Sequence, residues 1–338
     1  MDGVNYLKLL DPPAIDGLRF RRWKDRDDYQ QMAAVREGSR VWDQVDILSA
    51  REDVPTSEDL AATFPEAEVQ DSPDLLLVEI HGQIVGYNHV FWRWTEATGT
   101  RVYLHLGYLL PQWRRQGIGT TMLHWAQQRI LELAATEQPT GPTTFATNVS
   151  STESEANALI QQAGYVAVRR LSDMVLEPLL ELPTSTLPTE VSLLSLKPVH
   201  YPAVYQAWKN AFATMWMSSM ESEADYQEFV ANNLTCSGFD PALCPVAWVD
   251  NQVVGFVLSR IQKGVGVIAE VAVRQQWQRQ GIARSLLLHA LNALAHQDVD
   301  QVRLFTNAAN EQGARTLYER VGFREVKQHI LYRKPFHG

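Results

Sequence analysis

Two copies of one eight-residue phrase have the residue types and spacing to bind a diphosphate. The first copy is Gln-Trp-Arg-Arg-Gln-Gly-Ile-Gly at residues 112–119, and the second is Gln-Trp-Gln-Arg-Gln-Gly-Ile-Ala at residues 276–283. Each copy follows an apolar, strand-like run and opens a helix-periodic segment. Such a turn points several backbone N–H groups and the positive end of a helix dipole at one spot. Gly117 and Gly281 let the backbone approach a ligand without an intervening Cβ.

Two residues of the second half could move protons, and the first half lacks both. Tyr318 lies in the phrase Leu-Tyr-Glu-Arg-Val-Gly-Phe, where the first half has Ile160. Glu270 lies on the run before the second loop, and Leu106 is its counterpart when the two phrases are aligned. A free alkyl ammonium has a pKa near ~10, so an amine nucleophile needs a proton acceptor such as a carboxylate. We therefore expect catalysis only in the second half.

The spacing of both phrases, Arg/Gln-x-x-Gly-x-Gly/Ala, resembles the acetyl-coenzyme A signature of the GCN5-related N-acetyltransferases (the GNAT family). The resemblance covers about residues 18–178 and 190–334. A degraded first copy followed by an intact second copy resembles the tandem architecture of mycothiol synthase. The contacts to coenzyme A that the resemblance implies are Arg114, Arg115, Gln116, Gly117, Ile118 and Gly119 in the first half, and Gln278, Arg279, Gln280, Gly281, Ile282, Ala283 and Arg284 in the second.

The resemblance also implies catalytic roles in the second half. Tyr318 matches the tyrosine that protonates the departing thiolate, and Glu270 would accept the proton of the amine. The backbone of Val271 and Val273 would pair with the pantetheine amides. The N–H of Val271 or Ala272 would hold the thioester carbonyl. The structural alternatives are a solvated or salt-bridged strand carboxylate for Glu270 and a packed helix tyrosine for Tyr318.

Three further features complete the expected site. Asn307 and Asn310 resemble asparagines that bond the pantetheine arm or fix its loop, although Asn310 could equally be a helix N-cap. Asn148 is expected in the place of Asn307 in the first half. The acceptor pocket is expected to include residues 213–220, a Met- and Trp-containing cluster that could equally be core.

The resemblance implies an α/β fold of two tandem domains. Each domain would be a mostly antiparallel, twisted sheet that is splayed between its fourth and fifth strands and flanked by helices. The Pro- and Thr-rich segment 183–189 is the expected linker between an N-terminal domain, 1–182, and a C-terminal domain, 190–338. A chain of 338 residues also has the length of about two domains.

Hydrophobic periodicity places the expected elements in the same order in each half. The first half has strand 18–23, helix 25–37, hairpin 75–92, strand 143–147, helix 153–163 and a strand from 164. The second half has strand 191–196, helices 201–213 and 224–233, hairpin 246–260, strands 267–273 and 302–306, helix 311–321, and strands near Phe323 and Ile330.

Composition excludes several other classes of function. The chain has 30 basic and 39 acidic residues and a net charge of −9, which argues against nucleic acid as a partner. Arg114, Arg115, Arg279 and Arg284 would supply a local basic patch for coenzyme A. The spacing of the two cysteines fits neither a metal site nor a disulfide framework. No apolar stretch reaches the ~18 residues of a membrane span, so we expect no metal, no membrane partner and a cytoplasmic monomer or homodimer.

The leading hypothesis is an acetyl-coenzyme A-dependent N-acetyltransferase that acts on a primary amine of a small molecule by direct attack. The second half would carry catalysis, and the first half would be structural or would bind coenzyme A without turnover. A protein or peptide N-terminal acetyltransferase is one alternative. A non-catalytic sensor of acyl-coenzyme A is the other.

Overall fold

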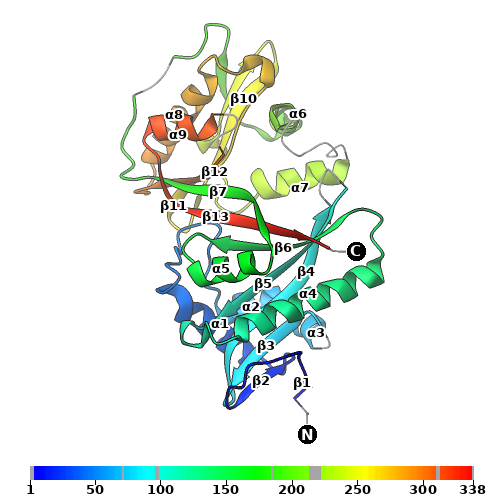
Figure 1. Ribbon diagram of the computed structural model, residues 1–338. Coiled ribbons are helices and arrows are strands. Elements are labelled where there is room, and N and C mark those ends of the chain that lie inside the picture. Colours follow the sequence, from blue (N-terminus) through cyan, green and yellow to red (C-terminus); the bar gives the residue numbers. More distant parts are fainter. Residues whose placement is uncertain are drawn as a thin grey trace. The chain divides into compact units, whose positions relative to one another are not determined.

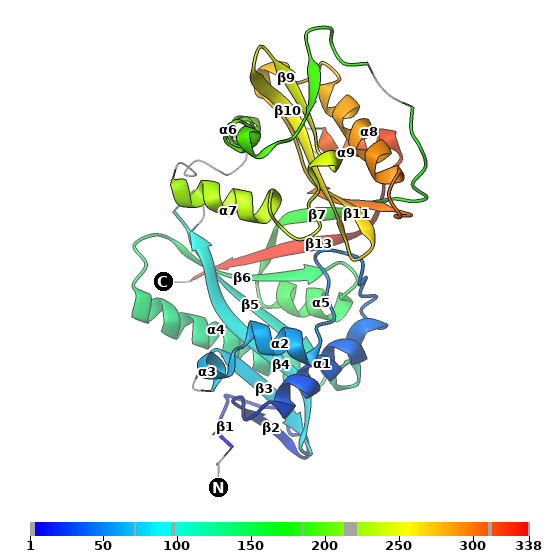
Figure 2. The same cartoon turned by 180° about the vertical axis from the view of Figure 1, so that it is seen from behind.

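The computed structural model describes residues 4–70, 72–95, 99–183, 186–212, 222–309 and 313–336. The chain forms two compact units, which differ from the predicted ranges (Figures 1 and 2). The first unit contains Met1–Arg170 and His329–Gly338, and the second contains Leu171–Gln328. The predicted linker, 183–189, therefore lies within the second unit.

The first unit contains a sheet in the strand order β1-β2-β3-β4-β5-β6-β13. All neighbours are antiparallel except β5 and β6. Its strands are β1 (Tyr6–Leu7), β2 (Leu18–Arg21), β3 (Leu75–Ile80), β4 (Gln83–Thr95), β5 (Arg101–Leu109), β6 (Thr143–Ser150) and the end of β13 (Arg324–Pro335). Its helices are α1 (Asp27–Arg40), α2 (Ser57–Thr63), α3 (Glu66–Val69), α4 (Ile118–Glu137) and α5 (Ser154–Gln162).

The second unit repeats this plan in the strand order β7-β12-β11-β10-β9-β8. Here β11 and β12 are the parallel pair. Its strands are the end of β7 (Val166–Leu176), β8 (Ser192–Ser195), β9 (Pro245–Val249), β10 (Gln252–Gln262), β11 (Val265–Val273) and β12 (Val302–Asn307). Its helices are α6 (Tyr201–Phe212), α7 (Glu223–Asn233), α8 (Ile282–Ala295) and α9 (Ala314–Val321).

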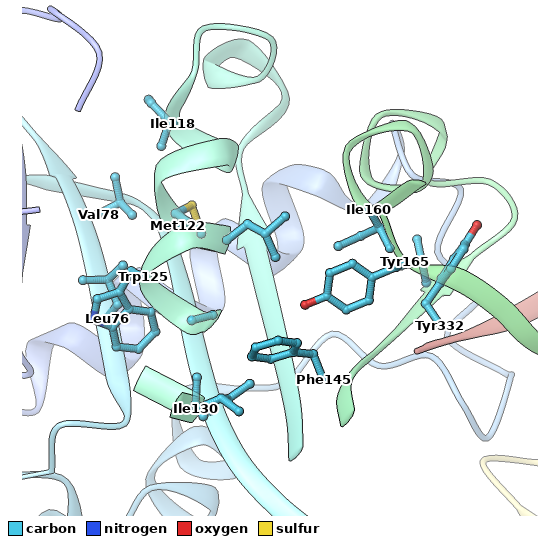
Figure 3. Close-up of a cluster of buried hydrophobic side chains, with 14 of the residues drawn as sticks. Leu76, Val78, Ile118, Met122, Trp125, Ile130, Phe145, Ile160, Tyr165 and Tyr332 are labelled. Atoms are coloured by element: carbon cyan, nitrogen blue, oxygen red, sulfur yellow. The ribbon is translucent and has the colours of Figure 1, made fainter. Parts of the chain in front are cut away.

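Each sheet is covered by helices on both faces because its buried strands alternate between two cores. In β3, Leu76 and Val78 pack with α4, whereas Leu75 and Leu77 pack with α1. Figure 3 shows Leu76 and Val78 beside Trp125 of α4. Burial of each such side chain stabilises the fold by about 1.5–3 kcal/mol. In the second unit the corresponding cores lie under α8 and α9 on one face and under α6 and α7 on the other.

The two halves of the sequence exchange their last strands. Leu176 of β7 lies opposite Val302 of β12, although β7 ends the first repeat. Pro335 of β13 lies opposite Thr144 of β6, although β13 ends the second repeat. The strands predicted near Phe323 and Ile330 are a single strand, β13.

The predicted splay of each sheet is confirmed. Parallel pairing of β5 with β6 runs only from Arg101 to Leu104, and pairing of β11 with β12 runs only from Gly266 to Ile268. Residues 105–109 and 269–273 therefore have no strand on that edge within the described part of the chain. These free edges expose backbone N–H and C=O groups to any ligand that enters between the strands.

Candidate active site

The two glycine-containing loops have the same backbone conformation. Arg115 and Gly117 have φ values of 61° and 91°, and Arg279 and Gly281 have values of 63° and 83°. Left-handed backbone favours glycine, and each glycine is the N-cap residue of the following helix, α4 or α8. The sequence repeat is therefore also a structural repeat, with helix N-terminal N–H groups available at both loops.

A matching side-chain contact braces each loop. Gln278 Nε2 donates to the carbonyl oxygen of Val273 at 3.0 Å. Arg114 Nε donates to the carbonyl oxygen of Leu109 at 2.9 Å. Gln278 and Arg114 therefore fix the path from strand to helix.

The second loop is open on its outer side. Residues 278–281 are exposed, whereas Ile282 is buried in the core and anchors α8. Ala283 is partly buried in the same turn. Arg279 and Arg284 form no ion pair with any described residue, so both cations are available to an anion.

The first loop differs in the contacts of its first arginine. Arg114 donates to both carboxylate oxygens of Asp43, at 2.6 and 2.7 Å. Glu155 lies 3.7 Å from the same guanidinium. The charge of Arg114 is therefore balanced inside the protein, and Arg115 remains as the cation of the predicted basic patch. No sequence pattern pointed to Asp43, which lies 71 residues before Arg114.

A β-bulge sets the direction of Glu270. Glu270 pairs with Leu258 of β10, but the next residue of β10, Ser259, pairs with Ile268. Ala269 is thus left without a partner in the ladder. In a regular strand Glu270 would share a face with Ile268. The bulge instead places Glu270 on the face of Leu258, the face that α6 covers.

The environment of Glu270 suits a base that works near neutral pH. Burial raises the pKa of its carboxyl group to about 7. The Trp208 indole N–H and the Arg260 charge oppose this shift without cancelling it. Nε1 of Trp208 has no hydrogen-bond partner of normal geometry among the described residues. It is a donor near the carboxylate that a water or a substrate could engage.

Tyr318 of α9 lies near Glu270. Burial, and secondly the charge of Glu270, raise the pKa of the Tyr318 hydroxyl. Its ring packs edge-on against Phe323, with centroids 6.0 Å apart. Its hydroxyl has no hydrogen-bond partner in the described part of the chain. Tyr318 is thus a packed helix tyrosine whose buried hydroxyl stays protonated.

The structure also places several of the other predicted residues. Val271, Ala272 and Val273 lie on the free edge of β11, as the expected pantetheine contact requires. Asn307 Oδ1 accepts from the Ala309 N–H at 3.1 Å and so fixes the turn after β12. Asn310 and the predicted acceptor cluster, 213–220, lie outside the described residues.

The strand register corrects one expected equivalence. Because Ala269 is an extra residue, Gly266 corresponds to Tyr103; Gly266 pairs with Val302, and Tyr103 pairs with Phe145. Counting onward from these pairs, Asn307 matches Ser150 rather than Asn148. The segment that connects β5 to β6 differs in length from the segment that connects β11 to β12. The residue offset that aligns the two glycine-containing loops therefore does not apply to β6 and β12.

The first half has a cavity at the counterparts of Glu270 and Tyr318. The cavity has a volume of about 500 Å³, and both Leu106 and Ile160 line it. The ladder is regular here, with Val90 opposite His105 and no bulge. Burial lowers the pKa of His105 to about 3, and its Nε2 lies 2.9 Å from the Tyr165 hydroxyl. His105, to which no sequence motif pointed, is therefore a neutral structural residue.

The described residues contain neither a metal site nor a membrane span. No group of three or more His, Cys, Asp or Glu side chains among them could hold a metal ion. None of the described helices is long and apolar enough to cross a membrane.

The chain is similar in sequence and in fold to known acetyltransferases. A sequence model of the acetyltransferase (GNAT) family matches residues 42–142 and 201–323, more than half of the chain. A mycothiol acetyltransferase of Nocardiopsis dassonvillei is 24% identical over 336 residues, which span 92% of this chain and 94% of that protein. A mycothiol acetyltransferase of Streptomyces avermitilis is 28% identical over 184 residues, which span 53% of this chain and 58% of that protein.

Solved structures share the same fold. A GCN5-related N-acetyltransferase from Sphaerobacter thermophilus superposes with a TM-score of 0.74 at 21% identity. The superposition covers 95% of this chain and 96% of that one. The likeness therefore extends through both units.

Proposed function

We propose, since the chain belongs to the acetyltransferase (GNAT) family, that its second half transfers an acetyl group from acetyl-coenzyme A to a primary amine of a small molecule. The family uses acetyl-coenzyme A as donor. The observation that carries the proposal is the proximity of Glu270 and Tyr318 beside the free edge of β11. We assign catalysis to residues 190–338 and a non-catalytic role to residues 1–182, with 183–189 as the connecting segment.

The second loop fits the diphosphate of the donor. Its left-handed turn at Gly281 presents the N-terminus of α8, and a Cβ built on Gly281 would meet no atom within 4 Å. Backbone N–H groups of residues 279–283 would bind the diphosphate, with Arg279 and Arg284 as counter-charges. Gln278 and Gln280 would keep the turn in shape. Side-chain contacts support this last role, because Gln280 Nε2 donates to the Gln276 carbonyl at 3.3 Å.

The free edge of β11 would bind the pantetheine arm. Val271 and Val273 would pair with its two amides as an added strand would. The N–H of Val271 or Ala272 would hold the thioester oxygen and stabilise the negative charge that develops on it. Asn307 would support the arm from the end of β12, and we keep Asn310 as a further proposed contact.

The proposed reaction is direct transfer. The neutral amine attacks the thioester carbon, so a C–N bond forms and the C–S bond breaks. Glu270, directly or through a water, takes the proton that the amine loses. Tyr318 gives its proton to the departing thiolate. A pKa of about 7 for Glu270 leaves a useful fraction ionised at neutral pH, whereas the raised pKa of Tyr318 keeps the phenol protonated.

The first half would hold coenzyme A without turnover. Its loop, residues 114–119, has the backbone conformation of the second loop. Leu106 and Ile160 stand where Glu270 and Tyr318 stand, and neither side chain can accept or donate a proton. We therefore propose the first loop as a second binding site rather than a second active site.

The two mycothiol acetyltransferases support a small-molecule acceptor, and one of them aligns over nearly the whole chain. Because the sequences are only 24–28% identical, we infer from these relatives the class of acceptor, a small molecule, and not the particular compound.

Release of coenzyme A thiol tests the proposal. The purified chain is mixed with acetyl-coenzyme A and a panel of small amines, amino sugars and peptides with free N-termini. We expect release with at least one small amine and its loss in Tyr318→Phe. Release with peptides alone would favour the N-terminal acetyltransferase. Donor binding without release for any acceptor would favour the sensor.

A further inference from the structure

Part of the wall of the cavity in the first unit is aliphatic, although charged and polar residues also line the cavity. Leu106 and Ile160 line it at the places that Glu270 and Tyr318 hold in the other half. Met122 also lines it, and Figure 3 shows Met122 on α4 and Ile160 on α5, both within the buried cluster of this unit. A thioester held beside β5 would thus meet aliphatic side chains where the second half offers proton-transfer groups.

One buried side-chain oxygen at this cavity, Oδ1 of Asn88, has no hydrogen-bond donor among the described residues. Asn88 lines the cavity and is only 3% exposed, and its Oδ1 has no hydrogen-bond partner among the described residues. Asn88 Nδ2 faces the Met122 carbonyl at 3.4 Å, which leaves Oδ1 for a ligand. A buried, unsatisfied acceptor is unfavourable unless a ligand satisfies it.

Gly107 opens the space in front of Asn88. A Cβ on Gly107 would lie 3.0 Å from Asn88 Nδ2, closer than nearly all Cβ contacts in proteins. Gly107 is the residue of β5 that pairs with Asn88, and it lies on the free edge where a pantetheine amide would pass. The side-chain amide of Asn88 therefore lies close to the backbone of this edge, with Nδ2 as its nearest atom.

The charge balance around Arg114 makes the aliphatic part of the cavity wall important for the affinity of a ligand. The guanidinium of Arg114 is balanced by Asp43 and Glu155, so the first loop offers a diphosphate fewer free cations than the second. A ligand of this half must gain more of its binding free energy from apolar contact inside the cavity.

We propose that the cavity of the first unit binds a phosphopantetheine thioester whose acyl chain is longer than acetyl, and does not transfer it. The inference deepens the proposed second coenzyme A site and rests on it. The thioester could be carried by coenzyme A or by the phosphopantetheine arm of a carrier protein. Each added methylene buried against Leu106 and Ile160 should tighten binding about fourfold.

Calorimetry on the full chain carrying Gly281→Glu isolates the first site. Acetyl-, butyryl- and hexanoyl-coenzyme A are titrated separately, without acceptor. We expect the Kd to fall about tenfold or more from acetyl to hexanoyl. Equal Kd values for the three donors, tightest binding of acetyl-coenzyme A, or no binding at all would overturn the proposal.

Substitutions at Leu106 locate the acyl chain. In the same background, Leu106→Glu should weaken hexanoyl-coenzyme A at least tenfold and change acetyl-coenzyme A less than threefold. Leu106→Phe, which fills the space without adding charge, should have the same selective effect if Leu106→Glu fails to fold. Leu131→Glu is the matched control, because Leu131 is 41% exposed on α4. A loss of hexanoyl binding in Leu131→Glu as large as in Leu106→Glu would contradict the assignment.

Hexanoyl-phosphopantetheine, which keeps the phosphate that both carriers share, separates the two carriers. Binding as tight as that of hexanoyl-coenzyme A points to a carrier-protein arm, and binding at least tenfold weaker points to coenzyme A; either result supports a thioester site. This test is independent of acetyl transfer. A wild-type chain that acetylates no amine would end the proposed function and leave the chain-length result standing, whereas insensitivity to chain length with normal transfer would end only this inference.

Discussion

The carboxylate of Glu270 and the hydroxyl of Tyr318 interact, although they belong to opposite faces of one sheet. Glu270 reaches the face of α6 through the bulge at Ala269, and Tyr318 packs in the core under α8 and α9. Their electrostatic interaction contributes to the raised pKa of Tyr318. Parallel pairing of β11 with β12 ends at Ile268, so no backbone ladder on that side of β11 separates the two faces at Glu270.

Replacement of Tyr318 by phenylalanine tests the proton donor. Tyr318→Phe keeps the packing against Phe323 and removes only the hydroxyl, so we expect kcat to fall about 10²-fold with little change in KM for acetyl-coenzyme A. Steady-state thiol release measures both constants. Tyr165→Phe removes a buried hydroxyl of the first half and should leave kcat unchanged. A fall of less than threefold in Tyr318→Phe would argue for a purely structural tyrosine.

The pH profile tests the base. Glu270 acts when ionised, so kcat/KM should rise as the pH passes through about 7, the pKa of its carboxyl group. Glu270→Gln should lower the activity and remove this rise. The profile is measured from about pH 5.5 to about pH 9, a range that brackets this pKa, with an amine whose own titration is known. A rise that persists unchanged in Glu270→Gln would show that another group titrates.

The same pKa predicts how stability depends on pH. A glutamate carboxyl group ordinarily has a pKa of 4.5, and that of Glu270 in the folded protein is about 7, so the folded state binds more protons between these values. Glu270 should therefore reduce stability as the pH rises from about 4.5 to about 7. The gain in Tm of Glu270→Gln over the wild type should be larger near pH ~8 than near pH ~5. Thermal unfolding at the two pH values provides the comparison, and a gain that does not depend on pH would contradict the shift.

Matched glycine substitutions test whether only the second half is catalytic. Gly281→Glu places a carboxylate in the proposed diphosphate site and should abolish turnover. Gly117→Glu imposes the same left-handed strain, because φ is 83° at Gly281 and 91° at Gly117, yet it should leave most of the turnover. Equal losses would indicate that both loops serve one reaction. In the Gly281→Glu background, Ile160→Tyr should not restore thiol release, since Leu106 still offers no base.

The ion pair of Asp43 with Arg114 should stabilise the first unit. The side chains of Arg114 and Asp43 are 14% and 6% exposed, and removal of Asp43 leaves the buried guanidinium with only the more distant Glu155, at 3.7 Å. Asp43→Asn should lower the free energy of unfolding by about 3 kcal/mol. Glu37→Gln breaks an exposed pair with Arg40 and should cost less than about 0.5 kcal/mol. Urea denaturation measures both, and equal effects would mean that Asp43 contributes no more than a surface charge.

Local patterns in the sequence were enough to predict the family, the fold and the loops. The repeated phrase predicted two strand-turn-helix units, and the structure confirms the fold with the splayed strands. The bulge at Ala269 was not predictable, because neither Ala269 nor its neighbours differ in type from residues of a regular strand. The pairing of Asp43 with Arg114 depends on the path of a loop 71 residues away. The exchange of β7 and β13 could not be predicted, because the sequence of a repeat is the same whether its last strand pairs within its own copy or with the other copy.

That exchange has a consequence for any attempt to separate the two halves. A fragment cut after residue 182 would carry β7 away from β12 and would leave β6 without β13, so both sheets would have an open edge prone to aggregation. Neither repeat can therefore be removed without taking a strand from the sheet of the other, whatever its own chemistry.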